Sequence, residues 1–279
     1  MIKENTSFIM TVLNEESSIS GFLDSLFKQS VLPSEIIIVD GGSKDSTLEV
    51  MLKYFKNKHL IINEFKPEYL SENLIKYYEG YLFGKLKFNI FIAPYSKISR
   101  GRNIAIENSN GEIICASDAG CVLSPDWLYE ITKHIDKNSG NHVAGGMSLP
   151  IVENFIQAVL SACILPYVYE IKKESFMPSS RNISFTRTAW EKAGKYPEFM
   201  DFGEDMKFNF NLKHAGFKIY FNPKAKVYWN LRNNLKSIFI QFFRYAKGDA
   251  IGGMYKLRHM ILFFSIILFA ALTIISVLI

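Results

Sequence analysis

Polar and acidic side chains follow three strand-like segments in the first half of the chain. They are Thr11 near the end of the apolar run at 7–12 with Asn14 and Glu15 after it, Asp40 at the end of 35–40, and Asp118 after 112–117. Any one of these residues alone is typical of a helix cap or a turn. Together they predict a binding site, because the carboxyl ends of parallel strands meet at one edge of a sheet.

Two adjacent acids, Glu204 and Asp205, begin a helix-like segment at 203–216. Acids in the first turn of a helix interact favourably with the helix dipole, by about 0.3–1 kcal/mol each, and this is the simplest interpretation of the pair. A carboxylate that reaches a substrate hydroxyl can also accept its proton as a general base. The second interpretation requires Asp205 to share a cleft with the strand-end residues.

The elements that position these residues alternate in type. Residues 16–30 carry apolar side chains at helical spacing, whereas 35–40 is a continuous apolar run of the kind found in a parallel strand covered on both faces. Such alternation predicts an α/β fold with a mostly parallel central sheet flanked by helices. We expect residues 66–87 to form an inserted helical excursion between two strands.

Positive charge is concentrated near the C-terminal end. The whole chain of 279 residues carries a net charge of +5, but residues 213–258 contain ten Lys or Arg and one acid, Asp249. Such a segment suggests phosphate groups as partners, in a nucleotide, a nucleic acid or an anionic membrane surface.

The last residues favour the membrane among these partners. Residues 260–279 contain no charge, glycine or proline, and as a helix they would span about 30 Å, the thickness of the hydrocarbon core of a bilayer. A buried core helix is the alternative. Lys256, Arg258 and His259 precede the span, which predicts a single-pass cell-membrane protein whose preceding domain is cytoplasmic. Nucleic-acid binding is disfavoured.

The segment before the span has amphipathic character. A helix from residue 235 would carry Leu235, Phe239 and Phe242 on one face and basic residues opposite, as expected of a helix that lies on a membrane surface. A soluble amphipathic helix is the alternative. The three cysteines fit neither a disulfide framework nor a zinc spacing.

Seven segments together resemble the family 2 glycosyltransferases, which have the GT-A fold. The resemblance covers about Ser7 to Gly253 and is carried by TVLNEE, VDGGSKDST, SRGRN, SDAGC with PDW, RNISF, GEDMKF and QFFRYAKG. It implies a nucleotide-diphospho-sugar donor, with Thr11, Asn14 and Glu15 lining the base and ribose pocket and Asp40 accepting hydrogen bonds from the base. Gly41 replaces a second acid that the family often has. Arg102 and Asn103 match the family's nucleotide-contacting pair.

Asp118 matches the first acid of the family's Asp-x-Asp motif, which holds the ribose and a divalent cation. The resemblance therefore implies Mg²⁺ or Mn²⁺ with Asp118 as a ligand. Gly120 replaces the acid that usually contacts the metal most directly, so either the phosphates and Asp118 hold the ion or nearby cations share its role. Arg244 and Lys247 match basic residues that could neutralise the departing diphosphate. Membrane-surface charge is the alternative for these two.

Asp205 matches the acid that inverting members use as general base, and Glu204 then orients the loop. We therefore expect a membrane-anchored inverting glycosyltransferase with a saccharide or lipid-linked acceptor, in cell-envelope or exopolysaccharide synthesis.

The alternatives are a polyprenyl-phosphate sugar synthase and a non-catalytic protein that binds a nucleotide sugar. A dinucleotide-dependent oxidoreductase is disfavoured, because no glycine-rich turn follows the first strand. The expected regions are a nucleotide-sugar half at 1–118, an acceptor half at 119–234, an interface helix at 235–259 and the span at 260–279.

Overall fold

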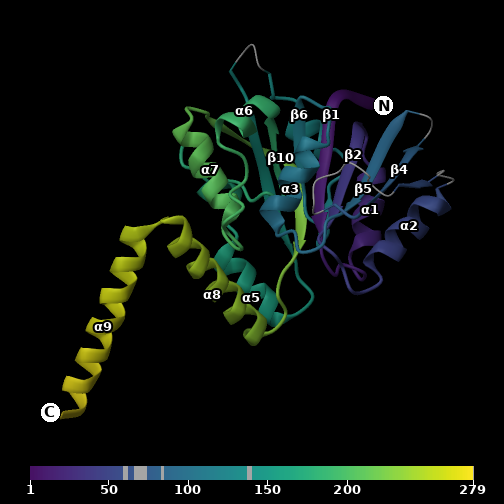
Figure 1. The fold of residues 1–279 in the computed structure, drawn as a ribbon. Helices are drawn as coiled ribbons and strands as arrows, with labels where there is room; N and C mark the ends of the chain where they lie inside the picture. Colours follow the sequence, from purple (N-terminus) through teal and green to yellow (C-terminus); the bar gives the residue numbers. More distant parts are fainter. Residues whose placement is uncertain (59–61, 66–73, 83–84, 137–139, 279) are drawn as a thin grey trace.

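Among the residues that the structure describes, a ten-stranded mixed sheet with helices on both faces forms the body of the protein (Figure 1). The computed structural model describes residues 1–279 apart from 59–61, 66–73, 83–84, 137–139 and 279. The strand order is β3-β4-β5-β2-β1-β6-β9-β8-β10-β7. The strands are β1 (Ile2–Val12), β2 (Leu32–Asp40), β3 (Ile62–Phe65), β4 (Lys76–Leu82), β5 (Leu86–Ile92), β6 (Ile113–Ala116), β7 (Cys121–Leu123), β8 (Val143–Ile151), β9 (Ile183–Thr186) and β10 (Ile219–Asn230).

The centre of the sheet is parallel. β1 pairs in parallel with β2 on one side and β6 on the other, and β2 pairs in parallel with β5. Thr11 faces Val39 across the first pair, so the carboxyl ends of β1 and β2 lie at one edge. β9 runs antiparallel to β6 and β8 and joins the central strands to the second half of the chain. The predicted α/β fold is confirmed, with a mixed sheet.

Two hydrophobic cores lie on opposite faces of the sheet. The first packs α1 (Ile19–Phe27), α2 (Thr47–Asn57) and α4 (Trp127–Thr132) against side chains such as Phe8 of β1. The second packs α3 (Ile98–Glu107), α6 (Arg187–Lys192) and α7 (Glu204–His214) against side chains such as Ile9, the next residue of β1. Successive residues of a strand point to opposite faces, so the continuous apolar runs fill both cores.

Residues 76–82 are a strand, and the predicted helical excursion is wrong there. β4 pairs antiparallel with both β3 and β5. Tyr78 enters the first core, while Tyr77 stacks on Phe65 with ring centroids 4.7 Å apart. Aromatic side chains suit the pleated surface of a sheet and override the helical spacing that the sequence suggested. Residues 66–73 and 83–84 of the predicted excursion lie outside the described residues.

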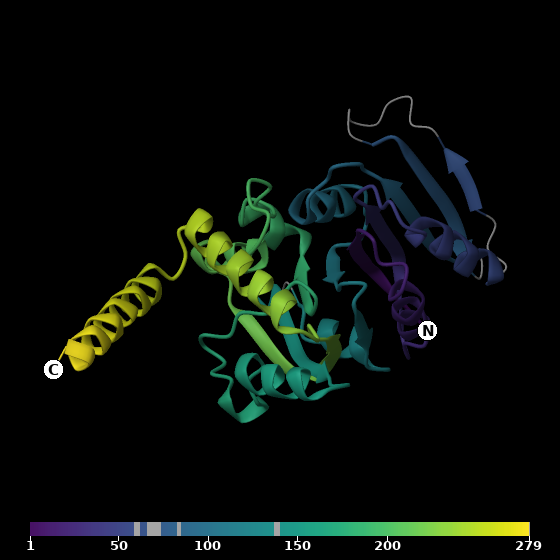
Figure 2. The same cartoon turned by 90° about the horizontal axis from the view of Figure 1, so that it is seen from below.

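Two helices, α8 (Leu235–Gly252) and α9 (Lys256–Leu278), end the chain. α8 runs past α5 (Phe155–Ile164) beneath the sheet, and α9 extends away from the body (Figures 1 and 2). Within the described part of the chain, one helix is long and apolar enough to cross a membrane, at 256–276, with a mean hydropathy of 2.3 and no buried part. α8 also exposes large apolar side chains, among them Leu235, Phe239 and Phe243.

Candidate active site

A cavity of about 650 Å³ opens at the carboxyl ends of the central parallel strands. Thr11 of β1, Gly41 after β2 and Asp118 after β6 form one wall. Asp205 of α7 and Arg244 of α8 lie on the wall contributed by the second half of the chain. Segments that are far apart in the sequence therefore meet around one space.

Ten residues were assigned a catalytic, donor-binding or metal-binding role from the sequence, and six of them line this cavity, namely Thr11, Glu15, Arg102, Asp118, Asp205 and Arg244. The other four are absent from the cavity wall. They are Asn14, Asp40, Asn103 and Lys247.

Asp40 orders the loop after β2, and Asn14 connects that loop to the loop after β1. Asp40 is buried, and its Oδ1 accepts hydrogen bonds from the backbone N–H groups of Gly42 (2.8 Å) and Ser43 (2.7 Å). Asn14 Oδ1 accepts from the N–H of Lys44 at 2.8 Å, and the N–H of Asn14 donates to Ser43 Oγ at 2.9 Å. These bonds fix the loop after β2 against the loop after β1, which positions Gly41 and Glu15 at the cavity wall.

Arg102 links the strand wall of the cavity to the helix wall. Its guanidinium is buried and donates to Asp118 Oδ1 at 3.0 Å and to Glu204 Oε1 at 2.8 Å. It also lies over the ring of Tyr196, with Cζ 5.3 Å from the centroid. Burial alone would lower the pKa of Arg102, but the two carboxylates outweigh it and the pKa is raised. Arg102 is therefore a permanent charge that holds both acids in place.

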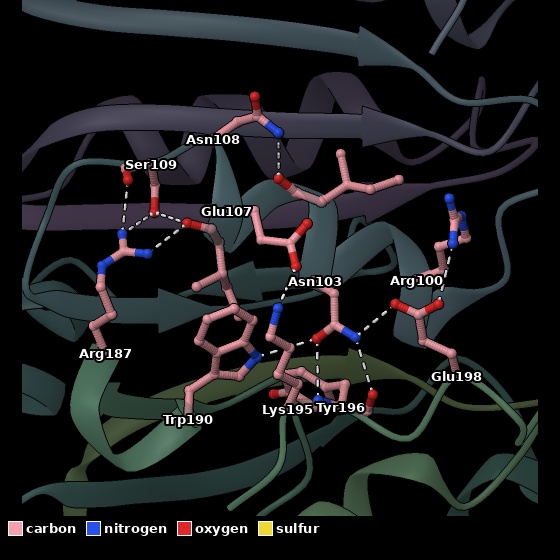
Figure 3. Close-up of polar contacts among 12 residues, drawn as sticks. Arg100, Asn103, Glu107, Asn108, Ser109, Arg187, Trp190, Lys195, Tyr196 and Glu198 are labelled. Atoms are coloured by element: carbon pink, nitrogen blue, oxygen red, sulfur yellow. Dashed lines mark hydrogen bonds and ion pairs between the residues drawn. The ribbon is translucent and has the colours of Figure 1, made fainter. Parts of the chain in front are cut away.

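Asn103, the neighbour of Arg102, faces the body of the protein (Figure 3). Its Oδ1 accepts from Trp190 Nε1 (3.1 Å) and from the N–H of Tyr196 (3.0 Å). Its Nδ2 donates to the carbonyl of Tyr196 and to Glu198 Oε1, both at 2.9 Å. The amide thus fastens α3 to the segment between α6 and α7, and it sets the position of Arg102.

The two acids of α7 have different surroundings. Gly203 precedes them with a φ of +72°, a left-handed conformation that favours glycine and turns the chain sharply into the helix. Asp205 Oδ2 accepts from Ser179 Oγ at 3.0 Å, and Asp205 itself is half-buried at the cavity wall. Burial and the adjacent Asp205 charge raise the pKa of Glu204 to about 7, although Arg102 opposes the shift.

Helix α8 approaches the cavity closely because Gly248 has no side chain. A Cβ at this position would lie 2.2 Å from the carbonyl oxygen of Phe202. The guanidinium of Arg244 lies over the ring of Phe202, with Cζ 5.1 Å from the centroid, and Arg244 lines the cavity. Lys247 is exposed on the same helix. Of the two basic residues singled out on α8, the structure brings Arg244 to the cavity.

Arg181 is a cavity residue that the sequence reasoning missed. Its guanidinium stacks on Trp229, with Cζ 3.6 Å from the ring centroid, and its Nε lies 3.8 Å from Asp118 Oδ2. Arg181 begins the RNISF segment, so its charge and its place in a recognised segment were a usable signal. Arg232 also lines the cavity. With Arg102 and Arg244, these residues give the cavity four guanidinium groups.

The chain offers little to a metal ion here. Across the residues that the structure describes, no group of three or more His, Cys, Asp or Glu side chains is placed to hold one. Asp118 is a single carboxylate with two guanidinium neighbours, and Gly120 leaves open space where a second acid would stand. The residues fit a divalent cation only if bound phosphates and water supply most of its ligands.

The chain belongs to glycosyl transferase family 2, whose sequence model matches residues 7–75 and 62–175. It is therefore a glycosyltransferase, of a class that moves a sugar from a nucleotide donor, and the resemblance recognised in the sequence is confirmed.

Two curated relatives align along most of the chain. The dolichyl N-acetyl-α-D-glucosaminyl phosphate 3-β-D-2,3-diacetamido-2,3-dideoxy-β-D-glucuronosyltransferase of Methanococcus voltae is 27% identical, over 87% of this chain and 72% of the relative. The poly-β-1,6-N-acetyl-D-glucosamine synthase of Staphylococcus epidermidis is 22% identical over 88% of this chain. The chain spans about half (54%) of the length of that synthase.

Solved structures share the fold. The mannosyltransferase PcManGT of Pyrobaculum calidifontis, in complex with GDP-Man and Mn²⁺, has a TM-score of 0.62 at 16% identity, over 88% of this chain and 61% of that chain. Residues 1–349 of TarS of S. aureus, in complex with UDP-GlcNAc, have a TM-score of 0.57 at 20% identity, over 82% of this chain and 59% of that chain.

Proposed function

We propose that this protein is an inverting glycosyltransferase that moves a sugar from a nucleotide-diphosphate donor to a lipid-linked acceptor at the cytoplasmic face of a cell membrane. The observation that carries the proposal is the position of Asp205 on the wall of the cavity that Thr11, Arg102 and Asp118 also line. A carboxylate with a hydroxyl neighbour thus faces the space in which the strand ends would hold a donor.

The donor would lie along the strand ends. Thr11 and Glu15 line the cavity where the base and ribose would bind, with Asn14 and Asp40 supporting the loops beside them. The diphosphate would meet Arg181, Arg232 and Arg244, because fixed guanidinium groups are good partners for phosphate oxygens. Lys247 is exposed and suits the anionic surface of a membrane.

A divalent cation, Mg²⁺ or Mn²⁺, would be held by Asp118 together with donor phosphates, and it would neutralise charge on the departing diphosphate. The solved complex of PcManGT with Mn²⁺ supports a cation in this fold. The guanidinium groups of Arg181 and Arg244 supply part of the same neutralisation from the chain itself.

Asp205 would act as the general base. Its carboxylate accepts the proton of the acceptor hydroxyl while the hydroxyl oxygen bonds to the anomeric carbon and the bond to the diphosphate breaks. Attack on the face opposite the leaving diphosphate inverts the configuration of the sugar. Ser179 Oγ donates to Asp205 Oδ2 at 3.0 Å and the N–H of Met206 donates to Oδ1 at 2.8 Å, and these two bonds would hold the carboxylate in position for the acceptor.

The membrane assignment is supported by α9 and the residues at its start. Lys256 and Arg258 lie in the first turn of α9, and the candidate span at 256–276 has no buried part. Basic residues at this end of the span favour a cytoplasmic position for the domain that precedes it. The Methanococcus voltae relative is named for a dolichyl-linked sugar phosphate acceptor, which supports a lipid-linked acceptor here. That relative and the Staphylococcus epidermidis synthase support a role in envelope glycan or polysaccharide synthesis.

The experiment is a screen of nucleotide sugars by thermal unfolding, each with Mg²⁺, Mn²⁺ or chelator. The cognate donor should stabilise the protein by about 2.7 kcal/mol at a hundredfold excess over its Kd. That donor is then incubated with a lipid-linked sugar or with bare polyprenyl phosphate, and the product configuration is read by NMR. Transfer with retained configuration contradicts the proposal, and a donor that binds without any transfer favours the non-catalytic alternative. Transfer to bare polyprenyl phosphate alone favours the polyprenyl-phosphate sugar synthase.

A further inference from the structure

A second cavity of about 520 Å³ adjoins the first. The two share part of their walls, including Ser179, Arg181, Asp205 and Tyr245. Asp205 therefore stands between them, with the donor cavity on one side and the second cavity on the other. An acceptor that delivers its hydroxyl to Asp205 has to come from a space of this kind.

The second cavity is lined mainly by apolar side chains. Leu165 and Pro166 follow α5, Phe176 lies in the loop before β9, and Phe242 projects from α8. Such a wall stabilises an apolar ligand by removing its surface from water.

Charge appears where the cavity meets the start of α9. Arg258 lines it, and Asp249 Oδ2 accepts from Arg258 Nη2 at 2.7 Å and from His259 Nε2 at 2.9 Å. Tyr255 lies under the guanidinium of Arg258, with its ring centroid 4.2 Å from Cζ. One buried acid thus holds a guanidinium and an imidazole at this end, beside a long apolar wall.

Two helices that contribute to the cavity wall, α5 and α8, also expose apolar side chains. Phe155 and Val159 of α5 are exposed, as are Phe239 and Phe243 of α8. Figure 2 shows α5 and α8 on the same lower face of the body, with α9 leaving from the end of α8. Because α9 is the candidate span, this face lies next to the bilayer when α9 is inserted.

We propose that this cavity binds the lipid portion of the acceptor, an apolar chain joined to a phosphate, which enters from the bilayer between α5 and α8. The apolar wall holds the first part of the chain, Arg258 pairs with the phosphate, and the sugar hydroxyl reaches Asp205. This inference rests on the proposed function and adds to it the place and the chemistry of acceptor recognition.

The test compares two acceptors that carry the same head group. One is dolichyl N-acetylglucosaminyl phosphate and the other is N-acetylglucosaminyl methyl phosphate, each assayed in detergent with the donor found by the unfolding screen. Leu165→Gln and Phe242→Gln should raise the KM for the dolichyl acceptor about tenfold, since each removes apolar contact with the chain. The KM for N-acetylglucosaminyl methyl phosphate should stay within about twofold of the wild-type value, because this acceptor has no lipid chain that could contact the two side chains.

Matched controls separate the cavity from the membrane surface. Val159→Gln and Phe243→Gln remove exposed apolar side chains from the same two helices, outside the residues that line the cavity. They should leave both KM values within about twofold of wild type. Equal effects of cavity and control variants on the dolichyl acceptor would overturn the proposal, as would a wild-type enzyme with the same KM for both acceptors.

The phosphate contact has its own test. Arg258→Gln should raise the KM about tenfold for both phosphate-bearing acceptors. It should leave unchanged the KM for a third acceptor, the neutral methyl glycoside of N-acetylglucosamine, which has no phosphate. Arg258→Lys keeps the positive charge and should restore most of the lost affinity for the phosphate-bearing acceptors. An equal loss on the neutral glycoside would overturn the role of Arg258. Absence of transfer to any acceptor overturns the proposed function and this inference together, whereas transfer that ignores the lipid chain overturns this inference alone.

Discussion

Arg102 Nη1 lies 2.8 Å from Glu204 Oε1, although the two residues are 102 positions apart in the chain. This bond joins α3 to the first turn of α7, which also carries Asp205, and so connects the strand wall of the cavity to its helix wall. Both side chains are buried, 3% and 9% exposed. Loss of either partner leaves the other as a buried charge with incomplete compensation.

Arg102→Met should therefore lower the free energy of unfolding by about 3–5 kcal/mol. Arg100→Met is the matched control on the same helix, because its ion pair with Glu198 (3.2 Å) is more than one-third exposed. The Arg100→Met variant should lower the free energy of unfolding by about 0–1 kcal/mol. Urea unfolding of the full chain in detergent measures both free energies. Similar losses of stability in the two variants would contradict the structural role of the buried Arg102–Glu204 pair.

The raised pKa of Glu204 predicts a pH dependence of stability. An acid with a pKa of about 7 in the folded state and an ordinary value near 4.5 in the unfolded state binds more protons when folded between those values. Its contribution is therefore complete below about pH 4.5 and lost as the pH rises to about 7.

Glu204→Gln removes this titration, although it also weakens the pair with Arg102. The free energy of unfolding of the variant, taken relative to wild type, should rise between pH 5 and pH 8. Urea unfolding at four pH values in this range measures the difference. A difference that does not change with pH would show that Glu204 titrates near its ordinary pKa.

Gly248→Ala should impair transfer through the position of α8. The added Cβ would meet the carbonyl of Phe202, so α8 has to move and carry Arg244 away from the cavity. We expect a loss of kcat of at least about tenfold, since small displacements of positioned groups are costly in catalysis. Gly21→Ala in α1 is the control, because a Cβ there meets nothing within 4 Å. If both variants retain the kcat of wild type, α8 has no role in positioning Arg244.

Gly120→Asp tests where a divalent cation binds. A Cβ at Gly120 meets nothing within 4 Å, so a side chain can be introduced there without a clash at its first atom. If Asp118 holds the cation, a second carboxylate should lower the Mn²⁺ concentration for half-maximal activity about tenfold. Gly120→Asn introduces a side chain of similar size without charge, so its Mn²⁺ concentration for half-maximal activity should stay near the wild-type value. An unchanged requirement in both variants would remove Asp118 as the ligand.

The sequence predicted the parts of the fold that depend on local pattern. Continuous apolar runs and helical spacing identified β1, β2, β6 and the helices between them. It failed at β4, whose tyrosines are placed by pairing with β3 and β5, a long-range effect that no local spacing shows.

The same distinction between local pattern and long-range contact applies to the residues of the candidate site. Asp118, Asp205 and Arg244 were found from residue type and segment, and the structure brings them to one cavity. Arg181 was missed, because its position depends on stacking against Trp229 of β10. Asn103 was predicted together with its neighbour Arg102, but successive residues of a helix point in different directions. The amide of Asn103 bonds to Trp190 and Tyr196 instead of reaching the cavity wall.

The measurement that tests the central claim most directly is donor binding and sugar transfer by Asp205→Asn, each measured separately. Asparagine keeps the size of the side chain but cannot accept the proton of the acceptor. We expect donor Kd within about twofold of wild type and kcat lower by about 10²–10⁴-fold. Glu107→Gln, at an exposed ion pair with Lys195, is the control and should retain wild-type kcat. Transfer by Asp205→Asn at the wild-type rate would contradict the role of Asp205 as general base.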